Sequence, residues 1–126
     1  MTSLNKILYA EDEDDIREIA TLALETIGEL ETITCESGVP VIELALSFQP
    51  QLILLDVMMP DMDGPTTLKA LKTHEQLKST PVVFLTAKIL PDEIERFKSL
   101  GAVAVISKPF DPMTLADQIK QIWTKL

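Results

Sequence analysis

The sequence is poor in cysteine, histidine, glycine and aromatic residues, and it has no long apolar run. Its single cysteine, Cys35, excludes an internal disulfide and favours a reducing compartment. No apolar stretch approaches the roughly 18 residues that a membrane-spanning helix needs, and the first residues lack the apolar core of a signal peptide. We therefore expect a soluble cytoplasmic protein, with Cys35 buried as a small apolar side chain.

Positive charge is also scarce. The chain has 20 acidic side chains against 11 Lys and Arg, which gives a net charge of −9. Direct binding to nucleic acid or to an anionic membrane depends on clustered Lys and Arg, so the charge argues against both. Most of the acidic side chains are expected to be solvated or to bind a cation. With 126 residues, 46% of them hydrophobic, the chain can bury one core, and we predict a single domain over residues 1–126.

Strand-like and helix-like segments alternate five times along the chain. The strand-like segments are short apolar or β-branched runs at residues 6–10, 32–35, 52–55, 82–85 and 103–106. Each precedes a segment with apolar residues at helical spacing, whose ends are marked by proline, glycine or acidic residues. The last helix is predicted to start at Asp111 and Pro112. The first is predicted to turn these residues toward the core: Ile16, Ile19, Ala20, Ala23, Leu24 and Ile27.

This alternation predicts a parallel sheet with helices on both faces, because crossover connections between parallel strands are right-handed. Five strands fit the flavodoxin-like, doubly wound α/β fold with strand order 2-1-3-4-5. In that order the first and third strands are neighbours, and their carboxyl ends flank the point at which the strand order reverses. Sheets of this kind bind their ligands there, so the residues that follow the strands are the candidates for function.

Polar residues able to handle phosphate or a metal follow four of the strands. They are Glu11 and Asp12, Asp56, Thr86, and Lys108. Carboxylates about 4 Å apart repel by on the order of 4 kcal/mol per pair at an effective dielectric near 20, so a cation must offset them. Oxygen-only ligands select a hard cation, and room for water and a phosphoryl oxygen favours Mg²⁺ over Ca²⁺. These parts suit phosphoryl transfer, in which an aspartyl group can be the covalent carrier.

Four segments carry a resemblance to a known family. They are residues 7–13 (ILYAEDE), 54–64 (LLDVMMPDMDG), 85–87 (LTA) and 107–110 (SKPF). With these segments in this order and spacing, the chain resembles the receiver domain of two-component response regulators from end to end. Because nothing follows the fifth predicted helix, it is expected to be most similar to stand-alone receivers of the chemotaxis-regulator type.

The resemblance implies a phosphoacceptor domain in phosphorelay signal transduction, not an enzyme beyond its own phosphorylation and dephosphorylation. Asp56 would accept a phosphoryl group from a sensor histidine kinase. Asp12, Asp56 and the main-chain carbonyl of Met58 would ligate Mg²⁺ directly, and Glu11 would act through metal-bound water. Lys108 would bind the phosphoryl group. The other implied partners are a downstream protein target or a histidine phosphotransfer protein.

The resemblance also concerns the residues around this group. The Thr86 hydroxyl would move toward the phosphoryl group, the small Ala87 would give phosphoryl donors access, and the peptide bond before Pro109 would be cis. Receivers couple the threonine to an aromatic residue on the fifth strand, where this chain has Val105. We therefore expect the response to travel through the loop after Thr86 and the helix at residues 91–100.

Partner binding in relatives uses the last two helices and the strand between them. On this basis Leu90, Phe97 and Val105 are predicted to contribute to a partner surface. The only histidine, His74, is predicted to be a surface residue at a helix end.

Two other functions remain open. Residues 61–66 (DMDGPT) approximate the signature of haloacid-dehalogenase-type phosphatases, which also use an aspartate nucleophile with Mg²⁺ on a parallel sheet. Here the segment does not directly follow its strand, and the chain is too short for the remaining motifs. Asp61 and Asp63 are instead predicted to shape a turn. The other possibility is a receiver-like binding module that is not phosphorylated.

Overall fold

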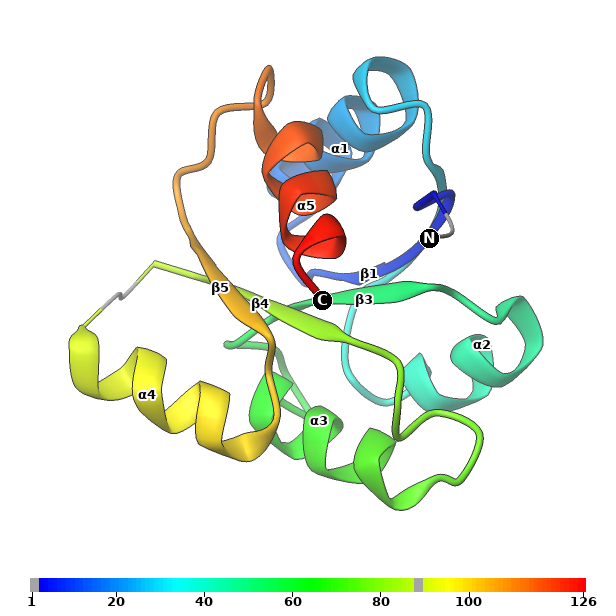
Figure 1. The fold of residues 1–126 in the computed structure, drawn as a ribbon, viewed down its shortest axis with the longest axis vertical. Coiled ribbons are helices and arrows are strands. Elements are labelled where there is room, and N and C mark those ends of the chain that lie inside the picture. Colours follow the sequence, from blue (N-terminus) through cyan, green and yellow to red (C-terminus); the bar gives the residue numbers. More distant parts are fainter. Residues whose placement is uncertain (1–2, 88–89) are drawn as a thin grey trace.

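The computed structural model describes residues 3–87 and 90–126, which contain one parallel sheet in the order β2-β1-β3-β4-β5 (Figure 1). The strands are β1 (Lys6–Ala10), β2 (Glu31–Cys35), β3 (Leu52–Asp56), β4 (Val82–Thr86) and β5 (Ala104–Ser107). The predicted flavodoxin-like, doubly wound α/β fold is confirmed, and no strand boundary differs from its prediction by more than one residue. The central strands β3 and β4 are buried at every position, as their unbroken apolar sequences indicated.

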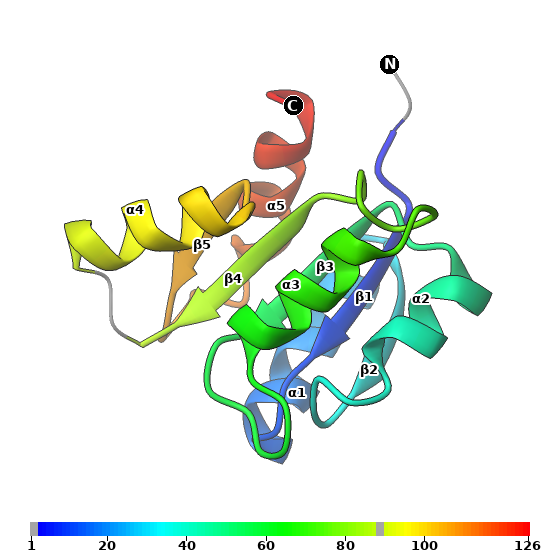
Figure 2. The same cartoon turned by 90° about the horizontal axis from the view of Figure 1, so that it is seen from below.

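Helices cover both faces of the sheet (Figure 2). One face carries α1 (Asp14–Leu22), its π-helical continuation η1 (Ala23–Ile27), and α5 (Leu115–Thr124). The other carries α2 (Val41–Phe48), α3 (Gly64–Thr73) and α4 (Pro91–Leu100). Among the described residues, none of these helices has the length and apolar character needed to cross a membrane.

Each face of the sheet has its own apolar layer, because successive side chains of a strand point to opposite sides. Ile7 and Tyr9 of β1 belong to the layer under α1 and α5, and Leu8 belongs to the layer under α2, α3 and α4. In the second layer the rings of Phe84 (β4) and Phe97 (α4) meet edge to face, with centroids 4.9 Å apart. Phe97 is therefore buried, and its predicted part in a partner surface is wrong.

The prediction for the core-facing side of the first helix is partly wrong. Ala20, Ala23 and Leu24 are buried, but Ile19 and Ile27 are 49% and 45% exposed. Ile19 lies at the border of the buried stripe. A π turn holds more residues than an α turn, so the α-helical spacing used for the prediction no longer applies at Ile27.

The start of the last helix also differs from its prediction. Helix α5 begins at Leu115, and Asp111 shapes a separate turn before it. The Asp111 Oδ1 accepts a hydrogen bond from the Met113 amide at 2.9 Å, and its carbonyl accepts from the amides of Thr114 and Leu115 at 3.0 Å each. Aspartate side chains offer the backbone such local bonds in place of helical ones, which is why Asp111 delays the helix.

Candidate functional site

Strands β1 and β3 bring three carboxylates together at the point where the strand order reverses. The register pairs Ala10 with Leu55, so the residues after these strand positions are neighbours. One oxygen each of Glu11, Asp12 and Asp56 lies within 4.8 Å of the others. Glu11 and Asp56 are buried, and Asp12 is half-buried. The structure thus assembles the acidic group that the strand order predicted.

Lys108 reaches this group from the end of β5. Its Nζ lies 2.8 Å from the Glu11 Oε1 and 3.2 Å from the Asp56 Oδ1. Its main-chain amide donates to the Thr86 carbonyl at 2.8 Å, which ties the β5 end to β4. The peptide bond between Lys108 and Pro109 is cis, as expected. The Glu11 contact was not predicted, and it is the shorter of the two ion pairs.

The surroundings of Asp56 disfavour the ionised form of its carboxyl group. Burial is the largest cause, and the neighbouring Glu11 carboxylate adds to it, so the pKa of Asp56 rises to about 7 although Lys108 acts in the opposite direction. Burial lowers the pKa of Lys108, but Glu11 and Asp56 more than reverse this, and the net direction is upward. The ammonium group therefore stays charged, yet it does not neutralise the three carboxylates.

The donor set fits a hard divalent cation. Its atoms are carboxylate oxygens, and three carboxylates facing one ammonium leave an excess of negative charge. The pKa of Asp56 is raised mainly by burial, and the Glu11 carboxylate adds to the rise. Glu11, Asp12 and Asp56 could therefore hold Mg²⁺. Met58, whose carbonyl was predicted as a further ligand, lies beside them, because its amide donates to the Asp56 Oδ1 at 3.3 Å.

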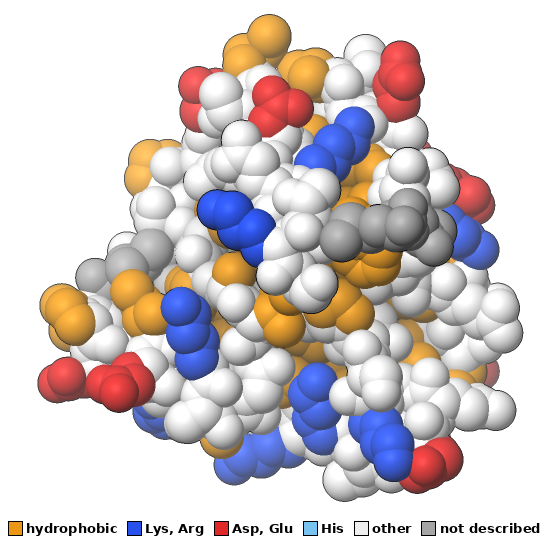
Figure 3. Space-filling model, in the orientation of Figure 1, with side chains coloured by type: hydrophobic (Ala, Val, Ile, Leu, Met, Phe, Trp, Pro, Cys, Tyr) orange, Lys and Arg blue, Asp and Glu red, His pale blue; other side chains and the backbone are white. Residues whose placement is uncertain are grey.

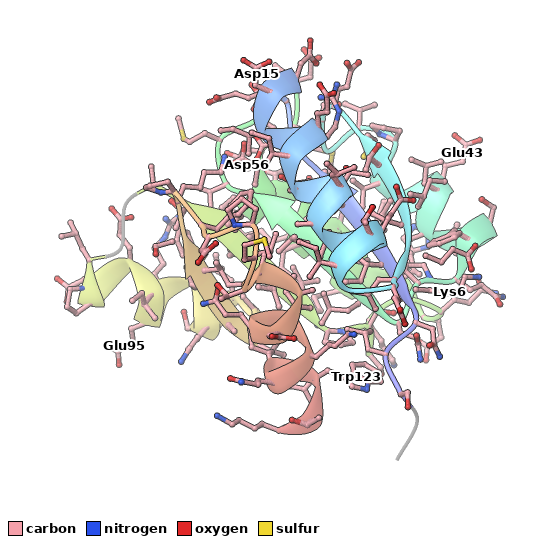
Figure 4. The ribbon with its side chains drawn as sticks, turned by 90° about the horizontal axis from the view of Figure 1, so that it is seen from above. Lys6, Asp15, Glu43, Asp56, Glu95 and Trp123 are labelled. Atoms are coloured by element: carbon pink, nitrogen blue, oxygen red, sulfur yellow. The ribbon has the colours of Figure 1, made fainter. Side chains whose placement is uncertain are left out.

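A cavity of about 580 Å³ opens over these groups. Thr86 and Ala87, at the end of β4, form part of its wall, and α4 contributes another part through Arg96. Figure 4 places Asp56 at the same end of the molecule as Asp15, at the start of α1. The cavity therefore leaves room for a small molecule beside Asp56.

Two further contacts hold Glu11 in place, and the sequence analysis missed both. The Tyr9 hydroxyl donates to the Glu11 Oε1 at 3.1 Å, and the Arg17 Nη1 donates to the Glu11 main-chain carbonyl at 2.9 Å. Tyr9 was read only as an apolar strand residue. The available signal was its spacing of two from Glu11, which puts both side chains on the same face of the strand.

The Tyr9 hydroxyl should stay protonated until the chain unfolds. Burial and the adjacent Glu11 carboxylate raise the pKa of Tyr9 far above its ordinary value. The unfolded phenol ionises near pH 10, so the native state binds more protons above that pH, and the free energy of unfolding falls as pH rises. Because Tyr9 is the only tyrosine, tyrosinate absorbance during an alkaline titration reports it alone. We expect that signal to coincide with loss of the circular-dichroism signal. Ionisation with an ordinary midpoint in a folded chain would contradict the buried contact.

A sheet of this order with acidic residues at its reversal point is the arrangement of receiver domains, and comparison with known families agrees. The chain belongs to the response regulator receiver domain family, whose model matches residues 7–120. Receiver domains are signalling domains of two-component systems and are not enzymes in the ordinary sense.

Particular relatives include the polar-differentiation response regulator DivK of Brucella ovis, which is 32% identical over 114 residues, covering 90% of this chain and 92% of DivK. The regulatory protein AtoC of Escherichia coli is 34% identical over 111 residues, 88% of this chain, but the match spans only 23% of AtoC. Among solved structures, the chemotaxis response regulator CheY4 of Vibrio cholerae is similar with a TM-score of 0.87 and 29% identity, over 95% of this chain and 99% of CheY4.

Proposed function

We propose that this chain is a phosphoacceptor receiver domain of a two-component phosphorelay. It takes a phosphoryl group from a sensor histidine kinase onto Asp56 in a Mg²⁺-dependent reaction, and phosphorylation switches binding to a downstream target or a histidine phosphotransfer protein. The observation that carries the proposal is the contact of Lys108 with an Asp56 carboxylate grouped with two other acids under an open cavity. We also propose that residues 1–126 form one receiver domain, located in the cytoplasm.

In the proposed reaction, one Asp56 oxygen attacks phosphorus. The new oxygen–phosphorus bond forms as the bond from phosphorus to the donor breaks, and the leaving group departs with that electron pair. Asp12, Asp56 and the Met58 carbonyl would hold Mg²⁺, with Glu11 acting through water, and the ion would supply positive charge to the phosphoryl oxygens. Lys108 is held by Glu11 at 2.8 Å, so it can turn from Asp56 to a phosphoryl oxygen without losing its other partner. Thr86 lines the same cavity, where its hydroxyl would donate to a phosphoryl oxygen.

Phosphorylation would add a charge of about −1.5 to −2 at the cavity, which is enough to shift a two-state equilibrium. Val105, at the position of the usual aromatic residue, is half-buried and packs against the layer that contains Phe97. Valine has no aromatic ring that could turn inward on phosphorylation. We therefore keep the proposal that the response runs from Thr86 into α4. Residues 88 and 89 of the connecting loop lie outside the described residues.

The phosphatase alternative has less support. Asp61 and Asp63 are exposed and are not part of the cavity wall. Asp61 adopts a positive φ of 65°, as turn aspartates can, and the Asp63 Oδ1 accepts from the Thr66 amide at 2.9 Å as the cap of α3. Asp63 thus caps a helix, and Asp61 occupies a turn position. The unphosphorylated binding module is disfavoured because Lys108 contacts both Glu11 and Asp56, and an oxygen of Asp12 lies within 4.8 Å of theirs.

Incubation with acetyl phosphate and Mg²⁺ should add one phosphoryl group to each chain, measured by intact-mass spectrometry. The adduct should be lost with hydroxylamine, as an acyl phosphate is, and chelation of Mg²⁺ by EDTA should prevent its formation. Multiple turnover of a simple phosphate ester would favour the phosphatase, and no adduct under any of these conditions would favour the binding module.

A further inference from the structure

The wall of the cavity over Asp56 carries more acidic than basic side chains. Its wall includes the acidic side chains of Asp12, Glu13, Asp56 and Glu93, and the basic side chains of Lys108 and Arg96. A phosphoryl donor is an anion and is repelled by these acids before it reaches Asp56. Lys108 is already engaged at 2.8 and 3.2 Å by two buried carboxylates. A second cation in the cavity wall would therefore offset part of this repulsion and favour the approach of the anionic donor.

The packing of α4 turns Arg96 toward the cavity. Phe97 is buried against Phe84, which fixes the rotation of the helix. Arg96 lies three residues after Glu93 and Phe97 four residues after it, so each is a neighbour of Glu93 on the helix surface. In contrast, Glu95 lies on the side of α4 away from Asp56 (Figure 4).

The Arg96 guanidinium is available for a ligand. Its side chain is exposed, and its central carbon lies 5.8 Å from the centroid of the Phe97 ring. Within residues 3–87 and 90–126, no ion pair engages it, although Glu93 lines the same cavity. In Figure 3, Lys and Arg side chains lie along the lower edge of the face, over α3 and α4, with acidic side chains at both ends of that edge.

We propose that Arg96 recruits and orients the anionic phosphoryl donor at the mouth of the phosphorylation cavity. The inference rests on the proposed function and adds a residue to it. A guanidinium presents a planar set of N–H donors that matches two phosphate oxygens at once, whereas an ammonium acts as a point charge. Arg96 would thus hold the outer phosphoryl oxygens while Lys108 and the metal ligands act at the inner ones.

The test compares Arg96→Ala, Arg96→Lys and Lys98→Ala. Lys98 is a matched control, because it is an exposed cation on the same helix that does not line the cavity. With acetyl phosphate below saturation, Arg96→Ala should lower the rate constant for phosphorylation by about 5- to 10-fold. Arg96→Lys should restore part of the rate, and Lys98→Ala should leave it unchanged.

Salt dependence separates this role from a structural one. The wild-type rate should fall with rising ionic strength more steeply than the Arg96→Ala rate, while the unfolding midpoints of the two proteins stay equal. Glu93→Gln should raise the rate, because it removes a like charge from the donor's path. Equal rates and equal salt slopes for wild type and Arg96→Ala would overturn the inference and leave the proposed function intact. Absence of any phosphorylation of the wild type would instead overturn the proposed function.

Discussion

Replacement of Asp56 by asparagine should abolish covalent phosphorylation, with a loss of at least about 10³-fold, since loss of a covalent nucleophile is among the most damaging changes to such a site. The amide keeps the shape of the side chain but cannot form the acyl phosphate. Glu11 and Asp12 remain, so the experiment asks which carboxylate is the acceptor. Mass spectrometry after treatment with acetyl phosphate and Mg²⁺ gives the answer, and an adduct on Asp12 would refute the assignment of Asp56.

Asp61→Asn is the matched control. It makes the same chemical change in the loop that follows β3, at an exposed side chain outside the cavity wall. Asparagine also tolerates the positive φ of this position. The control should be phosphorylated at the wild-type rate. A phosphatase that used Asp61 as its nucleophile would show the reverse pattern, with Asp61→Asn inactive.

The same Asp56 variant should be more stable than the wild type when no divalent ion is present. The pKa of Asp56 is raised from 3.8 to about 7, so the native state binds more protons than the unfolded state between these values, and stability falls as pH rises through that window. Above pH 7 the asparagine variant avoids a penalty on the order of 4 kcal/mol. Near pH 4 the two proteins should converge, which urea unfolding at both pH values would show.

Phe84→Ala should lower the free energy of unfolding by about 3–5 kcal/mol, the range for removing a buried phenylalanine. Phe84 is fully buried in β4 and gives Phe97 its edge-to-face partner. Its ring also lies close to Gly64, where an added Cβ would come within 3.0 Å of the Phe84 Cε1. The substitution therefore opens a cavity among β4, α3 and α4, and urea unfolding at neutral pH measures its cost.

Phe84→Leu is the control for volume and should cost less than about 1.5 kcal/mol, because most of the apolar volume remains. Phe48→Ala is the control for position. Phe48 is only half-buried at the end of α2, so its removal should also cost less than that of Phe84. Equal costs for Phe84→Ala and Phe48→Ala would show that the layer under α3 and α4 is not as tightly packed as described.

The strands and their order were predictable because each strand has a simple local pattern. Leu52–Leu55 and Val82–Leu85 are apolar without interruption, as strands buried on both faces must be. Once the order was inferred, the meeting of Glu11, Asp12 and Asp56 followed from the geometry of a parallel sheet.

The remaining differences arise from packing and local hydrogen bonds. The exposure of Ile19 and Ile27 depends on how α1 and η1 lie on the sheet, and the late start of α5 depends on the turn that Asp111 shapes. Arg96 could not be placed at the cavity from the sequence, because its direction depends on Phe97 packing against Phe84. The Tyr9–Glu11 bond was within reach of sequence reasoning, since strand spacing alone puts both on one face.

The placement of the only tryptophan decides how signalling in this protein can be observed. Trp123 and Lys6 lie at the end of the molecule opposite Asp56 (Figure 4), and Trp123 shares a cavity with Leu4 and Asn5 just before β1. The five residues of β1 span about 16 Å, which separates the indole from Asp56. The indole is thus poorly placed to report, through its emission, a change at Asp56. An optical assay of activation would need a fluorophore introduced near the cavity mouth, for example on α4.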